Sequence, residues 1–260
     1  MNGLTAQHFP GRDGALLAYR ETGEGRPLIL IHGFTANGLL MLEHGPAAAL
    51  AGHGYRVIAP DLRGHGDSAR PHDPAAYPPD VLADDGLALI DWLGLNPGSF
   101  ELAGYSLGGK VVLRQLARGA QPAHAVVAGQ GLDALDAESS RTGGHRQLLA
   151  RMVHGEAFEP GTPDALAAQW ITERGGDPLA MSLVLDSFTQ TPAAALRQVT
   201  VPTLVVVGDK DSRGDTAEDL AAALGNGHVV RVPGDHGGAL LAPELTAAIL
   251  DFLGRDPRHP

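Results

Sequence analysis

The chain of 260 residues contains no cysteine, which excludes disulfide bonds, catalysis by a thiolate and metal sites built on thiolates. It is also poor in basic residues, because 19 lysines and arginines stand against 30 aspartates and glutamates, for a net charge of −11. The basic residues are scattered along the chain and form no stripe. We therefore expect no nucleic-acid partner.

Long hydrophobic runs are missing as well. The uninterrupted apolar stretches are short, for example Leu204–Val207, and lie far below the roughly 20 residues needed to cross a bilayer. The first ten residues show no basic segment followed by an apolar one, so no signal peptide is expected. Hydrophobic residues make up 43% of the chain and charged residues 19%, which is typical of a globular protein. We expect a cytoplasmic protein that does not bind membranes.

The pattern of apolar runs and turns predicts strands that alternate with helices. Two early strands, Thr5–Phe9 and Ala15–Glu21, flank a glycine-containing turn and are typical of an antiparallel hairpin. Later strands are continuous apolar runs, as expected for strands buried on both faces. The later strands are expected at 27–31, 55–59, 99–104, 123–128, 203–207 and 228–232, and the helices between and after them at 46–52, 79–93, 107–118, 216–224 and 239–253.

Residues 133–198 interrupt this alternation. They contain no convincing strand, and three helical patches are expected there, at 146–154, 163–174 and 178–188. Strand–helix order with right-handed crossovers predicts an α/β fold with a doubly wound, mostly parallel sheet. We assign residues 1–132 and 199–260 to this core and 133–198 to a helical insertion.

A Gly-x-Ser-x-Gly pentapeptide at 104–108 carries the clearest chemical signal. Its serine, Ser106, lies between a predicted strand and a predicted helix, where a sharp turn can expose the hydroxyl as a nucleophile. Such a serine needs a histidine base, a carboxylate that orients the histidine, and donors for the developing oxyanion. Parallel sheets place catalytic groups at the carboxyl ends of their strands, so the partners should follow later strands.

Two strand ends supply these partners. The strand at 203–207 is followed by Gly208-Asp209-Lys210-Asp211, and the strand at 228–232 by Pro233-Gly234-Asp235-His236. We predict Asp211 as the acid and His236 as the base, in the chain order serine, acid, histidine. Asp209 and Asp133 remain alternative acids, and Asp235 is interpreted as structural.

The strand at 27–31 is followed by His32-Gly33-Phe34, which suggests where the oxyanion would bind. The backbone amides of Phe34 and Leu107 are the expected donors, and their side chains the expected pocket walls. Within the insertion, Trp170 and Met152 are candidate substrate-binding residues. They and their neighbours Phe158, Met181, Leu185 and Phe188 could equally form the small core of the insertion.

Together these stretches resemble the α/β-hydrolase superfamily, small capped serine esterase type, along nearly the whole chain. A further matching stretch, Asp61-Leu62-Arg63-Gly64-His65-Gly66-Asp67-Ser68, is common to the superfamily and is expected to be structural. The resemblance implies that the insertion is a cap like those of small esterases, lactonases, carbon–carbon bond hydrolases and cofactor-free perhydrolases. A serine nucleophile is unlike epoxide hydrolases and haloalkane dehalogenases. Many relatives have a Gly-His pair where this chain has Asp235-His236.

No metal or organic cofactor is expected. His32 and His65 are accompanied by no His-Glu-x-x-His motif or carboxylate cluster, so they are interpreted as hydrogen-bonded loop residues. The stretch 64–69 formally matches a dinucleotide fingerprint. Four prolines follow it between positions 71 and 79, and they exclude the helix that such a site needs.

The sequence thus predicts a serine hydrolase whose partner is a small-molecule substrate, a small to medium, largely apolar carboxylic ester or lactone. The reaction would pass through an acyl-enzyme. Carbon–carbon bond hydrolysis and cofactor-free perhydrolysis (haloperoxidase activity) by the same triad are alternatives. A ligand-sensing relative with little turnover is a third.

Overall fold

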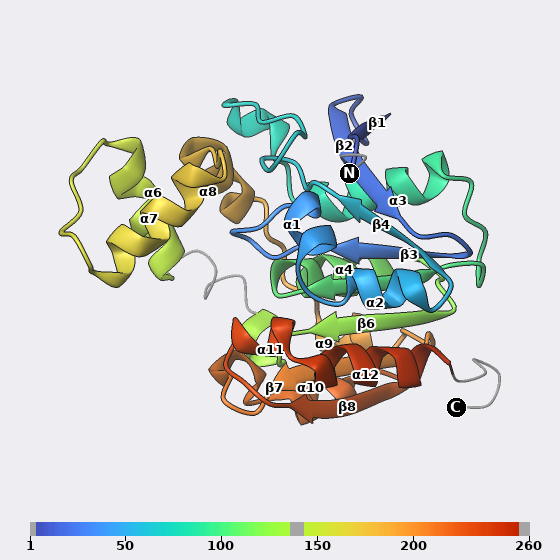
Figure 1. The fold of residues 1–260 in the computed structure, drawn as a ribbon. Helices are drawn as coiled ribbons and strands as arrows, with labels where there is room; N and C mark the ends of the chain where they lie inside the picture. The colour runs from blue at the N-terminus through green and yellow to red at the C-terminus, as the bar shows by residue number, and fades with distance from the viewer. Residues whose placement is uncertain (1–3, 136–142, 255–260) are drawn as a thin grey trace.

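The computed structural model describes residues 4–135 and 143–254, which form one eight-stranded sheet covered by helices (Figure 1). The strands lie in the order β1-β2-β4-β3-β5-β6-β7-β8. Their bounds are β1 Gln7–Pro10, β2 Leu16–Thr22, β3 Arg26–Ile31, β4 Tyr55–Pro60, β5 Glu101–Tyr105, β6 His124–Ala128, β7 Thr203–Gly208 and β8 Gly227–Val232.

Most of the sheet is parallel. β1 and β2 pair antiparallel, as the hairpin prediction requires, and β2 pairs antiparallel with β4. From β4 through β3, β5, β6 and β7 to β8 every pairing is parallel. The carboxyl ends of β5, β7 and β8 therefore meet at one edge, where Ser106, Asp211 and His236 follow them.

Two hydrophobic cores lie on opposite faces of the sheet, as expected for a doubly wound fold. Alternating side chains of β3 supply both, with Ile29 and Ile31 in one core and Leu28 and Leu30 in the other. The first core includes residues of α3 (Val81–Trp92), α4 (Leu107–Ala117) and α10 (Ala217–Ala223). The second includes residues of α1 (Gly38–Glu43), α2 (Ala47–Gly52), α11 (Gly238–Leu241) and α12 (Pro243–Leu253).

The described part of the chain between β6 and β7 contains helices and no strand, as predicted. Its longer helices, α6 (Gly144–Val153), α7 (Pro163–Glu173) and α8 (Pro178–Asp186), form a helical cap that projects to one side of the sheet, and α9 (Ala193–Leu196) leads back (Figure 1). Proline at the first helical position starts both α7 and α8. The preceding side chains, Thr162 and Asp177, accept the amides of Ala165 and Ala180.

Two details of the helix prediction were wrong. A single helix was expected over 239–253, but the chain forms α11 and α12 with Ala242 extended between them (φ −69°, ψ 130°). Pro243 causes the break, because it lacks an amide hydrogen and disfavours a helical residue before it. The short helices α1 and α9 were not predicted. Asn37 caps α1 by accepting the amide of Leu40.

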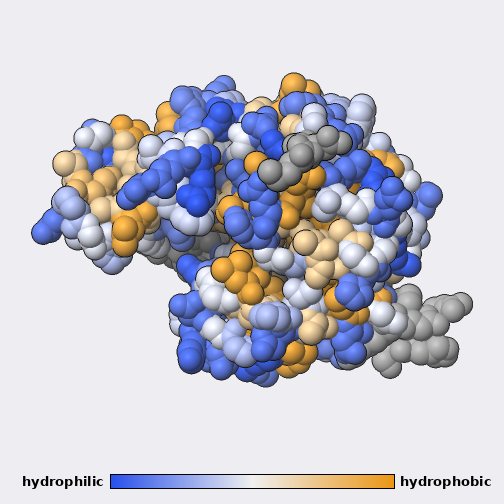
Figure 2. Space-filling model, viewed as in Figure 1, coloured by the Kyte–Doolittle hydropathy of each residue, from blue (hydrophilic) through white to orange (hydrophobic). Residues whose placement is uncertain are grey.

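The surface in Figure 2 is mostly hydrophilic, with hydrophobic residues in small, scattered groups on this face. Within residues 4–135 and 143–254, no helix combines the length and the apolar character needed to cross a membrane.

Candidate functional site

Ser106 occupies a strained turn between β5 and α4. Its backbone has φ 56° and ψ −112°, and only one other described non-glycine residue, Asp80, has a positive φ. The turn is possible because glycines flank it: a Cβ on Gly104 would lie 2.3 Å from the carbonyl carbon of Gly108, and one on Gly108 only 2.2 Å from the oxygen of Ile31. The Gly-x-Ser-x-Gly spacing is thus imposed by close backbone packing that holds the serine at the sheet edge.

The structure joins Ser106, His236 and Asp211 in one hydrogen-bonded chain. Ser106 Oγ lies 2.9 Å from His236 Nε2, and His236 Nδ1 lies 2.6 Å from Asp211 Oδ2. A carboxylate at Nδ1 keeps the proton on that nitrogen, which leaves Nε2 able to accept the serine proton. The residues lie 130 and 25 positions apart in sequence, so the parallel sheet brings them together.

The Asp211 carboxylate is held in place from two sides. Only 1% of its side chain is exposed, and its second oxygen accepts the amide of Arg213 at 3.0 Å, which caps the short 3-10 helix Ser212–Gly214. Burial alone would raise the pKa of Asp211. The hydrogen bond and charge of His236, together with the Arg213 amide, outweigh burial and lower this pKa. Asp211 is therefore an anion at neutral pH.

Neither of the two alternative acids hydrogen bonds to His236. Asp209 Oδ1 accepts the amide of Gly234 at 2.9 Å, which ties the loop after β7 to the loop after β8. The amide of Asp133 donates to Thr216 Oγ1 at 3.0 Å. Asp235 Oδ1 accepts the amide of Gly238 at 2.7 Å, in keeping with its structural interpretation. Among these four aspartates, only Asp211 hydrogen bonds to His236 through its side chain.

The amides of Phe34 and Leu107 lie beside the serine and have no acceptor among the described residues. Leu107 is the first residue of α4, so its amide has no carbonyl within the helix to bond. The loop that carries Phe34 approaches the serine closely, since a Cβ on Gly33 would lie 3.4 Å from Ser106 Cβ. Backbone amides without an acceptor near a serine hydroxyl could bind a negatively charged oxygen.

His32 and His65 hold this loop in place. His32 Nε2 accepts the amide of Leu62 at 3.0 Å, and its Nδ1 donates to the Gly33 carbonyl at 2.7 Å. His65 Nε2 donates to the Phe34 carbonyl at 2.7 Å. Complete burial, together with the neighbouring His65, lowers the pKa of His32 to about 3, so its ring is neutral. Each imidazole therefore serves as a fixed hydrogen-bonding group.

The stretch 61–68 is a structural bend, as expected. Asp61 accepts the amides of Gly38 and Asp67 at 2.7 and 2.9 Å. The fully buried Arg63 forms two hydrogen bonds with Asp85, each of 2.9 Å, and two with Asp13. This ion-pair cluster fastens the bend to α3 and to the hairpin turn.

A cavity of about 440 Å³ opens beside Ser106. Phe34 and Leu107 line it, as predicted, and so do Leu185 and Phe188 from the cap side. The lining also contains polar and charged residues that were not predicted: Lys110, Gln130, His145, Ser212, Arg213, Asp215 and Thr216. The cavity wall therefore combines apolar side chains with charged ones.

Trp170 and Met152 do not line this cavity. The Trp170 indole donates to the carbonyl of Thr35 at 2.9 Å, and the guanidinium of Arg174 stacks on its ring. Met152 packs against the core formed by the cap and the sheet. In this structure Trp170 instead links α7 to the loop after β3, and Met152 contributes to packing.

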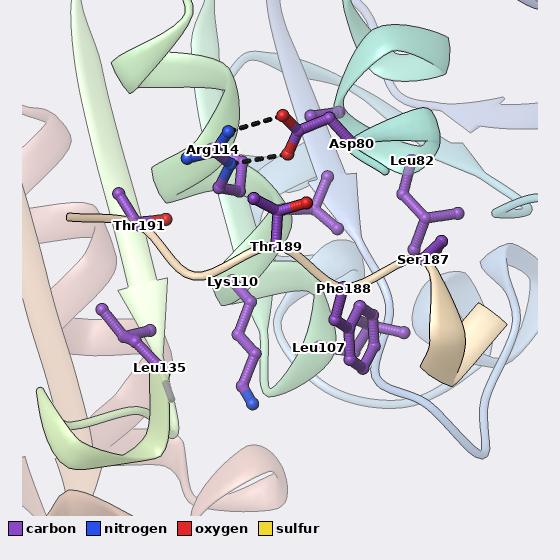
Figure 3. A pocket seen from close by; sticks show the side chains of 12 residues that line it. Asp80, Leu82, Leu107, Lys110, Arg114, Leu135, Ser187, Phe188, Thr189 and Thr191 are labelled. Carbon is purple, nitrogen blue, oxygen red and sulfur yellow. Dashed lines mark hydrogen bonds and ion pairs between the residues drawn. The ribbon is translucent and has the colours of Figure 1, made fainter. Parts of the chain in front are cut away.

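A smaller pocket of about 30 Å³ is drawn in Figure 3. Leu107, Lys110 and Phe188 line both spaces. The far side of the small pocket is bounded by Asp80 and Arg114, which form a two-point ion pair at 2.6 and 2.8 Å. The same two residues hold the backbone that carries Phe188. The Asp80 amide donates to the carbonyl of Ser187, and the Arg114 guanidinium donates to the carbonyl of Gln190. Phe188 is thereby positioned between the two pockets.

Comparison with known proteins gives relatives of the same kind. The AB hydrolase superfamily protein YisY of Bacillus subtilis is 40% identical over 102 residues, which are 39% of this chain and 36% of that protein. The chain thus matches only about a third of that relative's length. The non-heme chloroperoxidase of Burkholderia pyrrocinia is 29% identical, and the match covers 93% of this chain and 97% of the chloroperoxidase.

Among solved structures, a thermophilic esterase from Thermogutta terrifontis, with malate bound, superposes with a TM-score of 0.71. It is 26% identical, and the match covers 96% of this chain and 98% of the esterase. The model of the Alpha/beta hydrolase family matches residues 28–249, which include most of β3, strands β4 to β8 and the cap helices. By this match and by its fold, the chain belongs to the alpha/beta hydrolase family.

Proposed function

We propose that the protein is a serine hydrolase that cleaves a carboxylic ester or lactone. The observation that carries this proposal is the chain of hydrogen bonds from Ser106 through His236 to the buried Asp211. Serine is a weak nucleophile at neutral pH, and an adjacent imidazole held by a carboxylate is what makes it reactive. Membership of the alpha/beta hydrolase family is in agreement with this role.

In the proposed reaction, His236 Nε2 takes the proton of Ser106 as its Oγ attacks the ester carbonyl. The negative oxygen that forms is held by the amides of Phe34 and Leu107, and Asp211 stabilises the imidazolium. His236 then protonates the leaving alcohol, which departs and leaves the acyl-enzyme. A water molecule deprotonated by His236 attacks the acyl group, and the collapse of this second intermediate releases the acid and free Ser106.

The test is hydrolysis of a small aryl ester such as 4-nitrophenyl acetate. Ser106→Ala should lower kcat by at least about 1000-fold, since it removes the nucleophile. Ser212→Ala is the matched control, because Ser212 lines the same cavity but does not contact His236 through its side chain; it should retain most of the activity. Equal activity of Ser106→Ala and the native protein would refute the proposal.

A second candidate function is perhydrolysis, in which hydrogen peroxide replaces water and a carboxylic acid is converted to a peracid. It is favoured by the chloroperoxidase of B. pyrrocinia, which is similar over nearly its full length. The same serine, histidine and amides would serve both reactions. Peracid formation from acetate and peroxide at a rate well above aryl-ester hydrolysis would assign this activity instead.

A further inference from the structure

The charged side chains around the cavity indicate which class of substrate it could bind. Lys110 and Arg213 line it, together with the carboxylates of Asp133 and Asp215. Several solvent-accessible arginines of the described chain are paired with acids, for example Arg231 with Glu218 at 2.7 Å and Arg146 with Asp186 at 2.6 Å. The exposed Arg213 has no carboxylate within ion-pair distance among the described residues, although two carboxylates line the same cavity.

The position of Arg213 is fixed by the catalytic acid. It lies in the short 3-10 helix that Asp211 caps, and its own amide donates to Asp211. Its positive charge reaches the proposed catalytic centre: it contributes to lowering the pKa of Asp211, and after burial it is the largest cause lowering the pKa of His145. His145 is therefore neutral at neutral pH. The cation on this side of the cavity is Arg213.

Gln130 adds a second unsatisfied polar group. It follows β6, only 2% of it is exposed, and it also lines the cavity. Its Oε1 is buried and has no hydrogen-bond donor in the part of the chain that the structure describes. Leaving a buried amide oxygen without a donor is unfavourable, and a ligand that donates to it would remove that penalty.

We propose that Arg213 binds a carboxylate carried by the substrate, so that the preferred substrates are esters or lactones with a second, ionised carboxyl group. This inference rests on the proposed ester hydrolysis and names its substrate class. The planar guanidinium can bind a carboxylate through two parallel hydrogen bonds. Gln130 is left to accept a hydroxyl or amide hydrogen from the same substrate.

The test compares two aryl esters of similar size, the 4-nitrophenyl monoester of glutaric acid and neutral 4-nitrophenyl pentanoate. The native protein should have the higher kcat/KM for the charged ester. Arg213→Gln should lower kcat/KM for the charged ester by about 10- to 100-fold, the size expected for a hydrogen-bonded charge pair, and for the neutral ester by less than about 3-fold. The exposed Arg197→Gln is the matched control and should change neither value.

Two results would overturn the inference: equal losses for both esters in Arg213→Gln, or no preference for the charged ester in the native protein. If the native protein cleaves neither ester, the proposed function fails instead. The anion site is then tested by calorimetry of monomethyl glutarate binding to Ser106→Ala. Binding at least about 10-fold weaker in the Ser106→Ala, Arg213→Gln double variant supports the site, and equal binding refutes it.

Discussion

The hydroxyl of Tyr105 donates a 2.6 Å hydrogen bond to the carbonyl oxygen of His236, so the residue before Ser106 holds the loop that carries His236. The two rings also lie 5.5 Å apart between centroids. The contact joins β5 to the loop after β8, across the two strands that lie between them in the sheet. It therefore fixes the approach of the imidazole to Ser106.

Tyr105→Phe should lower kcat for an aryl ester by about 10-fold with little change in KM, because losing one hydrogen bond of about 1 kcal/mol loosens the position of His236. The control is Tyr77→Phe, since the buried Tyr77 hydroxyl has no partner among the described residues. That change should leave kcat unaltered and stability the same or higher. An undiminished kcat in Tyr105→Phe would show that the contact does not position the base.

Asp211→Asn should reduce kcat by about 10,000-fold, because an amide at this position neither favours the reactive tautomer of His236 nor stabilises its cation. Asp209→Asn and Asp133→Asn should each cost less than about 10-fold, since these side chains do not contact His236. Steady-state kinetics on one ester compares all three variants. If Asp133→Asn proved the most damaging, the acid would be assigned wrongly.

Gly108→Ala should destabilise the fold by several kcal/mol, because the new methyl group would lie 2.2 Å from the Ile31 carbonyl and force the backbone of β3 away from α4. Relief of this clash would also displace the Phe34 amide and lower activity. Gly52→Ala is the matched control. It lies exposed in helix α2 with no atom near the new methyl group, so it should be neutral or stabilising by up to about 1 kcal/mol. Thermal unfolding measures both.

Folding stability should fall on acidification below pH 6.5, and His32 should account for part of the fall. Its pKa is about 3 in the folded protein and about 6.5 when unfolded, so the unfolded state binds the extra proton between these values. The contribution of His32 to the free energy of unfolding is constant above pH 6.5 and decreases by about 1.4 kcal/mol per pH unit below it. His32→Gln, which retains an acceptor for the Leu62 amide, should remove that slope.

Urea unfolding at several values between pH 5 and 7.5 measures this slope. Substitution of the exposed His8 by glutamine provides the control and should leave the slope as in the native protein. An unchanged slope in His32→Gln would mean that His32 does not stay neutral in the fold.

The alternation of strands and helices was sufficient to predict the sheet and the three residues that follow its strand ends. Ser106, Asp211 and His236 could be found because parallel strands all end at one edge. The break at Pro243 also had a visible signal, since a proline lies inside the predicted helix. The helical spacing of the apolar residues predicted one continuous helix there, but Pro243 divides it into α11 and α12.

The pocket walls were less predictable. Trp170 and Met152 belong to cap helices whose faces contact different partners, and sequence spacing does not tell which face meets the cavity. The positions of Lys110 and Arg213 could have been predicted. Lys110 follows Leu107 by three residues in α4 and lies on the same helix face, and Arg213 follows Asp211 by two residues. Any side chain so close to a residue at the catalytic edge is a candidate for the cavity wall.

The proposed nucleophile is tested most directly by reaction with a fluorophosphonate, followed by mass spectrometry of the digested protein. An activated serine forms a stable phosphonyl ester, so the adduct should map to the peptide that contains Ser106 and be absent in Ser106→Ala. In His236→Ala the adduct should form far more slowly, because no base accepts the serine proton. An adduct on another serine, or none under conditions that label a known serine esterase, would contradict the assignment.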